Sequence, residues 1–338
     1  MRSFSSESQA LICSIRYCNS SGSMMVGLRH GSVQSWCWLA SHPDIMNAVL
    51  SHPDCLKKPF FYDFVKLEHA IFAGHYHLWK TQRKALNPTF NTRILNSFIP
   101  VFVQCSRQMV QHMEQSVGDV GRSISIFPFI SKCTLEMVCG TTIGCDVMEQ
   151  PGKETFIENL DRWFELVAKR MVSIHHYIEL LYRFSRDFTE ESEHRSSCFR
   201  FFETVIEKAK ARINSTAIED ECEDYKKPLI FADQLLAAQH NGNPFTDIEA
   251  THNIYAMIAA VNRFLPERSE GRSANVFIPF SAGARNCIGG RYAMLSMKVT
   301  LSSILRRLRL RSDLQMNDLQ FRFGLTLKLD LGDGGHCA

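Results

Sequence analysis

A single cysteine stands among small residues near the C-terminus, in the stretch PFSAGARNCIGG that runs from residue 279 to 290. After it, apolar residues recur at steps of three and four, so we expect a helix to begin near Ile288. The thiolate of Cys287 would then lie at a helix N-terminus, where unpaired N–H groups and the helix dipole stabilise negative charge. Gly283 and Gly289 permit unusual backbone angles and the close approach of a flat ligand.

Two further side chains of this stretch suit the same ligand. Arg285 can pair with an anion close to the thiolate, and Phe280 can cover the sulfur and keep water away from it. A thiolate, glycines that permit close approach and a carboxylate-binding arginine together suit a haem whose iron takes the sulfur of Cys287. A lone cysteine in a glycine-rich turn is more often structural, so the case for haem depends on the whole pattern F-x-x-G-x-R-x-C-x-G.

This pattern resembles the haem-binding loop of the cytochrome P450 family, the haem-thiolate monooxygenases. The resemblance continues in FLPER at 264–268 and in HLWKTQRKALNPTF at 77–90. The family uses a W-x-x-x-R pattern to reach a haem propionate, and Trp79 and Arg83 match it from one face of a helix. With LKKPFFYDF at 56–64 and CTLEMVCGTTIG at 133–144, the chain is similar to the microsomal fatty-acid hydroxylase branch and its insect relatives. The resemblance covers about residues 33–331, with gaps.

The resemblance implies haem b as cofactor, with Cys287 as axial ligand of the iron. It implies insertion of one oxygen atom of O2 into an apolar substrate: a fatty acid, a pheromone, a hormone or a xenobiotic. Electrons would come from an NADPH-dependent reductase at the cytosolic face of the endoplasmic reticulum membrane. No apolar run approaches the roughly 20 residues of a membrane span, so we expect no anchor in this chain. A net charge of +3 gives no reason to expect a nucleic acid partner. The basic run RRLRLR at 306–311 fits a solvated helix end better than a contact with anionic lipid.

The chain also departs from the family pattern. NPFTDIEATHNIYAMIAA at 243–260 resembles the first part of the central helix, whose later kink carries an acid–alcohol pair for proton delivery. Here the sequence passes from Ala260 to Val261 without that pair, and no glutamate has arginine three residues on. The proton-relay residues therefore stay unassigned. Two interpretations follow: a haem monooxygenase, or a non-catalytic haem-binding remnant or incomplete gene model with a gap after Ala260.

The elements that must position these residues are mostly helices. With 338 residues, 45% of them hydrophobic, the chain can bury a large core. We expect a mainly α protein with small β elements, an incomplete cytochrome P450 fold. Residues 1–30 are predicted to be poorly ordered and residues 31–338 to form a single incomplete domain. The cysteines include no C-x-x-C pair, and most of them are interpreted as buried small hydrophobes in a reducing compartment. Strands are predicted at 33–39 and 323–331, and helices from Pro43, within 66–86, over 91–114 with a break at Pro100, over 130–143, 154–170 and 199–213, and from Asp247.

Overall fold

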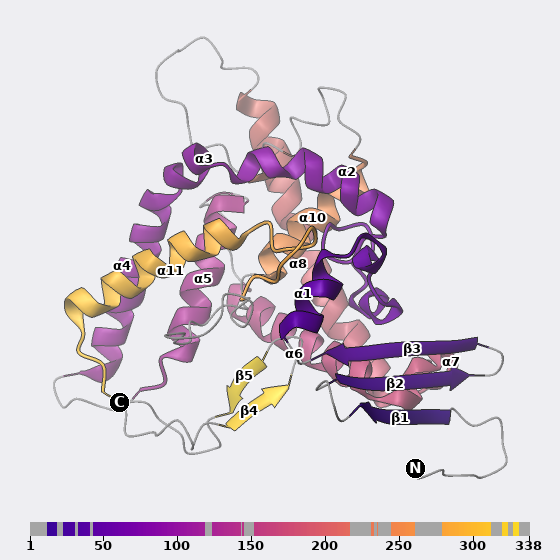
Figure 1. Cartoon of the computed structure of the whole chain (residues 1–338). Helices are drawn as coiled ribbons and strands as arrows, with labels where there is room; N and C mark the ends of the chain where they lie inside the picture. Colours follow the sequence, from indigo (N-terminus) through magenta and orange to yellow (C-terminus); the bar gives the residue numbers. More distant parts are fainter. Residues whose placement is uncertain are drawn as a thin grey trace. The chain divides into compact units, whose positions relative to one another are not determined.

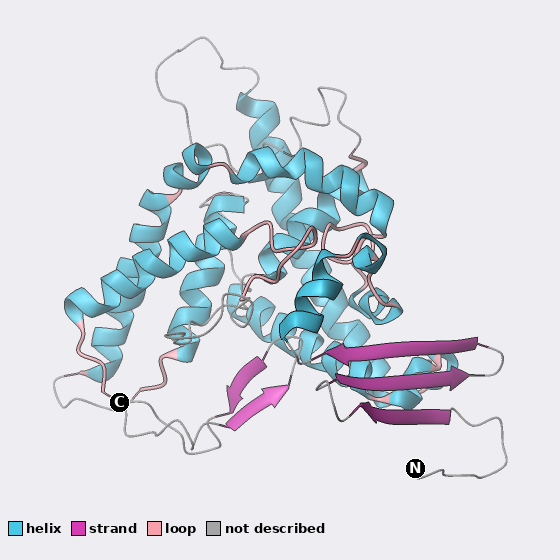
Figure 2. Cartoon of the chain, in the orientation of Figure 1, coloured by secondary structure: helices cyan, strands magenta, loops and turns pink. Residues whose placement is uncertain are grey.

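The computed structural model describes residues 12–18, 23–30, 33–40, 43–118, 124–142, 144, 152–216, 231–232, 235, 245–260, 279–311, 320–323 and 327–330 (Figure 1). The chain divides into two compact units, which are described separately. The first comprises residues 1–57, 170–184 and 266–287, and the second comprises residues 58–169, 185–265 and 288–338. Figure 2 shows that helices make up most of the described part and that strands form two small sheets. The expected mainly α class with small β elements is confirmed.

The first unit opens with a three-stranded antiparallel sheet in the order β1-β2-β3. Its strands are β1 (Ile12–Cys18), β2 (Ser23–His30) and β3 (Val33–Ala40). Val26 pairs with Ile15 on one side and with Cys37 on the other. The strand predicted at 33–39 is thus present. β1 and β2 contain apolar and β-branched residues, which favour extended backbone. The expectation of poor order over residues 1–30 stays a prediction.

Helix α1 (Pro43–Ser51) and the 3-10 helix η1 (Pro53–Leu56) follow the sheet. Proline at the first helical position suits the fixed backbone angle of that residue, and Asp44 in the first turn complements the helix dipole. The His52 side chain accepts a hydrogen bond from the Asp54 N–H at 3.3 Å and so caps η1. The carbonyl oxygens of Leu50 in α1 and Leu56 in η1 lie next to Gly283 and Arg285, in the stretch that contains Cys287.

The first unit also contains a buried arginine near its helix α7 (Glu179–Arg183). Arg170 is 1% exposed, and its guanidinium lies 2.5 Å from a carboxylate oxygen of Glu179 and 3.9 Å from the centre of the Tyr182 ring. The charge is therefore both paired and stacked, as a buried guanidinium requires. His176, in the 3-10 helix η5 (Ile174–Tyr177), accepts a further bond from Arg170 through its carbonyl.

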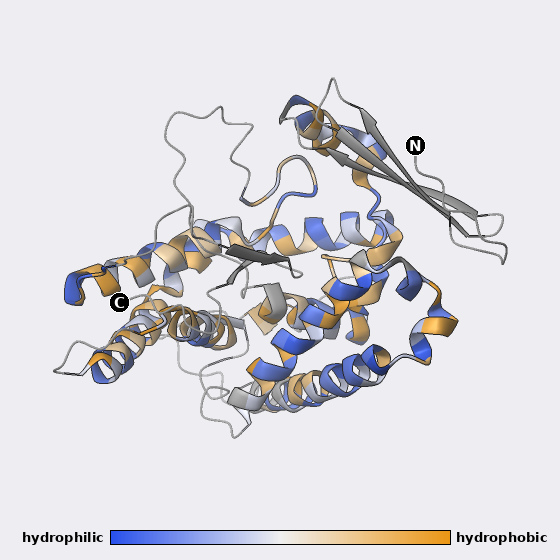
Figure 3. Ribbon diagram, turned by 90° about the horizontal axis from the view of Figure 1, so that it is seen from below, coloured by the Kyte–Doolittle hydropathy of each residue, from blue (hydrophilic) through white to orange (hydrophobic). Residues whose placement is uncertain are grey.

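The second unit is a helical assembly with one small hairpin. Its elements are η2 (Phe60–Val65), α2 (Tyr76–Leu86), η3 (Asn87–Phe90), α3 (Thr92–Ser97), α4 (Ile99–Val117), α5 (Phe127–Thr142), most of α6 (Lys153–Val172), α8 (Arg186–Thr216), α10 (Asp247–Ala260), α11 (Gly290–Arg307), β4 (Gln320–Phe323) and β5 (Leu327–Asp330). β4 and β5 pair antiparallel. Most helices in Figure 3 show both apolar and polar residues along their length, which is typical of helices with one buried face.

Helices α4, α5 and α11 lie side by side and share a core (Figure 1). Phe102 and Met113 on α4, Met137 on α5 and Tyr292 on α11 are all buried there. The ring of Tyr292 meets that of Phe102 edge-on, with centroids 5.1 Å apart. This core fixes the helix that directly follows the cysteine loop in sequence.

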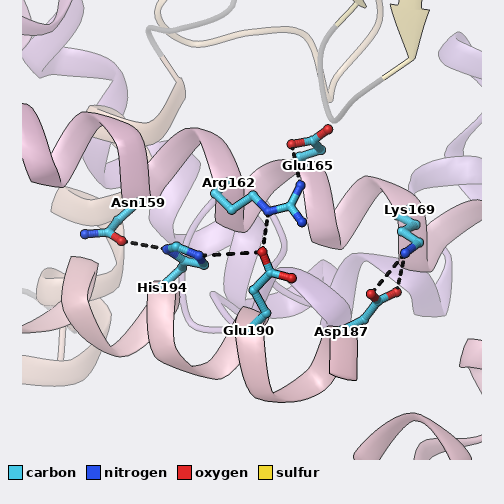
Figure 4. A network of polar contacts seen from close by, with 7 residues as sticks. All are labelled: Asn159, Arg162, Glu165, Lys169, Asp187, Glu190 and His194. Atoms are coloured by element: carbon cyan, nitrogen blue, oxygen red, sulfur yellow. Dashed lines mark hydrogen bonds and ion pairs between the residues drawn. The ribbon is translucent and has the colours of Figure 1, made fainter. Parts of the chain in front are cut away.

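Helices α6 and α8 are joined by a polar network, drawn in Figure 4. The Arg162 Nε–H donates to a carboxylate oxygen of Glu190 at 2.7 Å, and the Lys169 ammonium lies 2.7 Å from Asp187. This hydrogen bond from Arg162 lowers the pKa of Glu190. The network holds the first turns of α8, whose sequence RDFTEESEHRSS lacks an apolar stripe. For that reason the pattern-based prediction began this helix at residue 199, whereas it begins at Arg186.

Two other predicted boundaries lie at Pro100 and at the strand near the C-terminus. α3 ends at Ser97 and α4 begins at Ile99, so the chain divides next to Pro100, in the first turn of α4, where proline costs no hydrogen bond. The single strand predicted at 323–331 is instead a hairpin whose second strand is β5. FLPER at 264–268 lies outside the described residues.

Candidate haem-binding site

The cysteine loop, defined as residues 279–289, is closed by two backbone hydrogen bonds. The Cys287 N–H donates to the Phe280 carbonyl at 2.8 Å, and the Asn286 N–H donates to the Gly283 carbonyl at 3.2 Å. The Cys287 thiol is exposed to solvent, while Phe280 is half-buried. The loop therefore presents a thiol at the surface of the first unit on a backbone whose course is fixed.

Gly283 is the residue of this loop that no other amino acid could replace without rearrangement. Its φ angle is +69°, in the left-handed region that favours glycine. A Cβ atom at this position would lie 1.9 Å from the carbonyl oxygen of Leu50, in α1. The backbone of Leu50 thus approaches Gly283 closely. Close approach of a ligand at this glycine stays a prediction.

Arg285 ties the same loop to η1. Its Nε–H donates to the carbonyl oxygen of Leu56 at 3.0 Å, and the side chain is half-buried. A guanidinium carries five N–H donors in a planar fork, a geometry that matches a carboxylate. The bond orients the guanidinium, which a propionate partner needs.

Trp79 and Arg83 lie on α2, one helical turn apart. Trp79 is 7% exposed, its ring centre lies 6.0 Å from that of Tyr76, and Arg83 is half-buried. The Asn87 N–H donates to the Arg83 carbonyl where the helix ends. Between the two predicted residues lies Gln82, which is 1% exposed and absent from the sequence-based site.

Gly289 is the N-cap of α11, and its carbonyl accepts the bond from the Ala293 N–H at 2.9 Å that starts the helix. Of the predicted site residues, the structure brings four together in the first unit: Phe280, Gly283, Arg285 and Cys287. Trp79, Arg83 and Gly289 belong to the second unit.

The position of α11 is set by polar contacts inside its core. The Tyr292 hydroxyl lies 2.8 Å from the Thr141 hydroxyl of α5, and the Ser106 hydroxyl of α4 lies 3.4 Å from that of Thr300. Burial raises the pKa of Tyr292 far above its ordinary value, so this phenol stays protonated. Buried hydroxyl pairs of this kind need specific partners, so they help to specify where the helix lies.

The residues of the cysteine loop fit an iron-bound haem by the chemistry of their donors. A soft thiolate is a ligand that haem iron accepts, and one such ligand from the protein suffices. Among the described residues, no group of three or more histidine, cysteine or acidic side chains could hold a metal ion by itself. His75 precedes α2 as its N-cap residue.

The comparisons with known proteins decide the family. A model described as cytochrome P450 matches residues 14–262 and 260–330. The chain belongs to the cytochrome P450 family. Among similar proteins, cytochrome P450 4c21 of Blattella germanica is 22% identical over 400 residues, covering 83% of this chain and 79% of that protein. Probable cytochrome P450 4p3 of Drosophila melanogaster is 22% identical over 410 residues, covering 84% and 78%. A shorter match, to cytochrome P450 4g15 of Drosophila melanogaster, is 46% identical over 71 residues, 21% of this chain and 12% of that protein.

Membership of the cytochrome P450 family implies a haem cofactor, a redox partner, O2 and a substrate, and places the chain among monooxygenase-type oxidoreductases. The alignment with the Blattella germanica cytochrome P450 is longer than the part of this chain that it covers. Because 83% of 338 residues is about 280, about 120 of the 400 aligned positions have no residue of this chain beside them. The described helices include none that is both long and apolar enough to cross a membrane.

Proposed function

We propose that this chain carries the thiolate side of a haem monooxygenase, with Cys287 as the axial ligand of the iron. The observation that carries the proposal is the cysteine loop itself. Its exposed thiol stands on a backbone held by the bond from Cys287 to Phe280, by the contact of Gly283 with α1 and by the bond from Arg285 to Leu56. A ligand thiolate must be reachable and fixed in direction, and this loop supports both conditions.

When bound, haem would supply the redox chemistry by which one atom of O2 enters a substrate C–H bond and the other leaves as water, with two electrons from the redox partner and two protons from solvent. The side chains proposed around it hold and orient the cofactor. Trp79, Arg83 and Arg285 would donate hydrogen bonds to the propionates, as planar or charged N–H donors do well. Phe280 would shield the sulfur from water, and Gly289 would let the backbone come close to the ring.

The finer assignments are carried over from the resemblance. We propose haem b as the cofactor, an NADPH-dependent reductase as electron donor, and the cytosolic face of the endoplasmic reticulum membrane as the location. The substrate is proposed to be apolar: a fatty acid, a pheromone, a hormone or a xenobiotic. Residues 31–338 are proposed to form one incomplete cytochrome P450 domain, to which both compact units contribute.

A second candidate is a non-catalytic haem-binding remnant or an incomplete gene model. Several observations favour it for this chain. The two matched segments meet at residues 260–262, where α10 ends, and the roughly 120 alignment positions without a residue of this chain fit a missing internal segment. On α11, Met294, Leu301 and Leu305 are 43%, 47% and 59% exposed along one stripe of the helix. A stripe of this kind suits contact with further helices.

A reduced carbon monoxide difference spectrum tests the ligand. Wild-type protein reconstituted with haem should give the Soret band of a thiolate-ligated haem, and Cys287→Ala should lose it. Cys55→Ala is the matched control, because Cys55 is another exposed cysteine of the first unit. A band that is unchanged in Cys287→Ala would falsify the assignment.

Turnover and the gene model are tested separately. A transcript read across Ala260 and Val261 that contains extra coding sequence supports an incomplete gene model. Reconstitution with a reductase and fatty acids then measures oxygenation by this chain. Haem binding through Cys287 without turnover favours the remnant, whereas NADPH-dependent product formation excludes it.

A further inference from the structure

The segment 67–75, which leads into α2, is held in place by an amide side chain from α10. Asn253 Oδ1 accepts a hydrogen bond from the Ile71 N–H at 2.9 Å. Its Nδ2 donates to the Glu249 carbonyl at 2.8 Å, which fixes the orientation of the amide. Asn253 is 1% exposed, so water does not compete for these bonds.

A second amide reaches the same segment from α2. Gln82 Nε2 donates to the His69 carbonyl at 2.8 Å, and Gln82 is 1% exposed. The two amides thus contact residues 69 and 71 of one short segment from two different helices. The rings of His69 and His252 add a contact between this segment and α10, with centroids 5.2 Å apart.

Segment 67–75 is itself tightly turned. The Ala70 N–H donates to the Leu67 carbonyl at 2.9 Å, and the Gly74 N–H donates to the Ala70 carbonyl at 2.7 Å. A Cβ atom on Gly74 would lie 2.8 Å from that same carbonyl oxygen. Where the segment ends, the Trp79 N–H donates to the His75 carbonyl at 2.9 Å. The segment therefore continues directly into α2.

We propose that Asn253 is a positioning residue for α2, and through α2 for Trp79 and Arg83. The inference rests on the proposed function, in which these two side chains bind the haem propionates. Gln82 lies on α2 close to both residues and is hydrogen-bonded to segment 67–75. A shift of that segment therefore moves the helix that carries Trp79 and Arg83. The first half of the central helix therefore has a task of its own, separate from the proton delivery assigned to its second half in the family.

Haem affinity of the apo-protein is the main test. Asn253→Ala leaves the buried Ile71 N–H without its acceptor and should weaken haem binding about tenfold, which corresponds to about 1.4 kcal/mol. Asn253→Asp keeps an acceptor for Ile71 and loses the donor to Glu249. Its haem affinity should therefore lie between those of the wild type and Asn253→Ala. Asn159→Ala is the matched control, because Asn159 makes comparable side-chain bonds between α6 and α8 and should leave haem affinity unchanged.

A double-mutant cycle with Arg83→Ala separates positioning from general destabilisation. If Asn253 acts through Arg83 and its helix, Asn253→Ala should cost less haem affinity in the Arg83→Ala background than in the wild type. Fully additive losses, or unchanged affinity in Asn253→Ala, overturn the proposal.

Hydrogen exchange of the apo-protein keeps the proposal testable without haem. In Asn253→Ala, exchange should speed up both in segment 67–75 and in the first turns of α2. Faster exchange confined to the segment overturns the proposal. A wild-type protein that binds no haem through Cys287 refutes the proposed function instead, and the exchange result then decides whether Asn253 holds α2.

Discussion

The hydroxyl pair between Tyr292 and Thr141 permits a prediction whose sign and asymmetry both follow from geometry. The Thr141 Oγ1 atom lies 2.8 Å from the Met137 carbonyl and 2.8 Å from the Tyr292 hydroxyl. A carbonyl can only accept, so the Thr141 proton goes to Met137 and Tyr292 donates to Thr141. Both residues are buried: Tyr292 is 5% exposed and Thr141 is 2% exposed.

The two single substitutions should therefore differ in cost. Tyr292→Phe removes one donor and leaves Thr141 bonded to Met137, which should cost about 1 kcal/mol of unfolding free energy. Thr141→Val keeps the shape but leaves the Tyr292 hydroxyl buried without its acceptor, which should cost about 2 kcal/mol. In the double variant no hydroxyl is stranded, so its loss should be smaller than the sum by about 1 kcal/mol.

Urea unfolding followed by circular dichroism measures all three losses, with Ser302→Ala on the exposed side of α11 as the control for handling. The slope of free energy against urea must stay constant for the comparison to hold. If Thr141→Val costs no more than Tyr292→Phe, the donor assignment is wrong. If the double variant is additive, the two hydroxyls do not interact in solution.

Three other predictions concern titration, thiol access and a buried charge. Burial lowers the pKa of His252 below its ordinary 6.5, so the unfolded chain takes up a proton at a higher pH than the folded protein does. Stability should therefore fall as the pH drops below about 6.5. His252→Gln should make this fall smaller, as measured by urea midpoints at several pH values. In the apo-protein, maleimide should label both Cys55 and Cys287, and bound haem should protect Cys287 alone; labelling of both in the haem complex contradicts the ligand assignment. Glu179→Gln should destabilise by about 1.5 kcal/mol because Arg170 keeps its buried charge with a weaker partner, and an unchanged thermal midpoint would count against that pairing.

Local patterns predicted much of the helical fold. The break next to Pro100 and the helix that begins at Asp247 follow from residue types within a few positions, and the structure has both. The start of α8 could not be found this way, because its first turns are stabilised by ion pairs such as that between Lys169 and Asp187. Periodicity of apolar residues carries no information about such partners.

The candidate site shows the same division between local and distant causes. The motif around Cys287 identifies the loop, yet the reason Gly283 must be glycine is a carbonyl of Leu50 that no spacing rule reveals. Asn253 was missed altogether, since a lone asparagine in a helix gives no hint of a bond to the Ile71 N–H 182 residues away. A buried amide among apolar helix positions is the one signal that could have drawn attention to it.

The bond from Arg285 to Leu56 joins residues that are 229 positions apart in the chain. Contacts of such separation form late, because the loop-closure entropy must be met before they contribute anything. During synthesis, α1 and η1 leave the ribosome long before the cysteine loop exists. We therefore expect the thiol to take up its final direction only after the cysteine loop has met η1, because the bond from Arg285 to Leu56 cannot form before then.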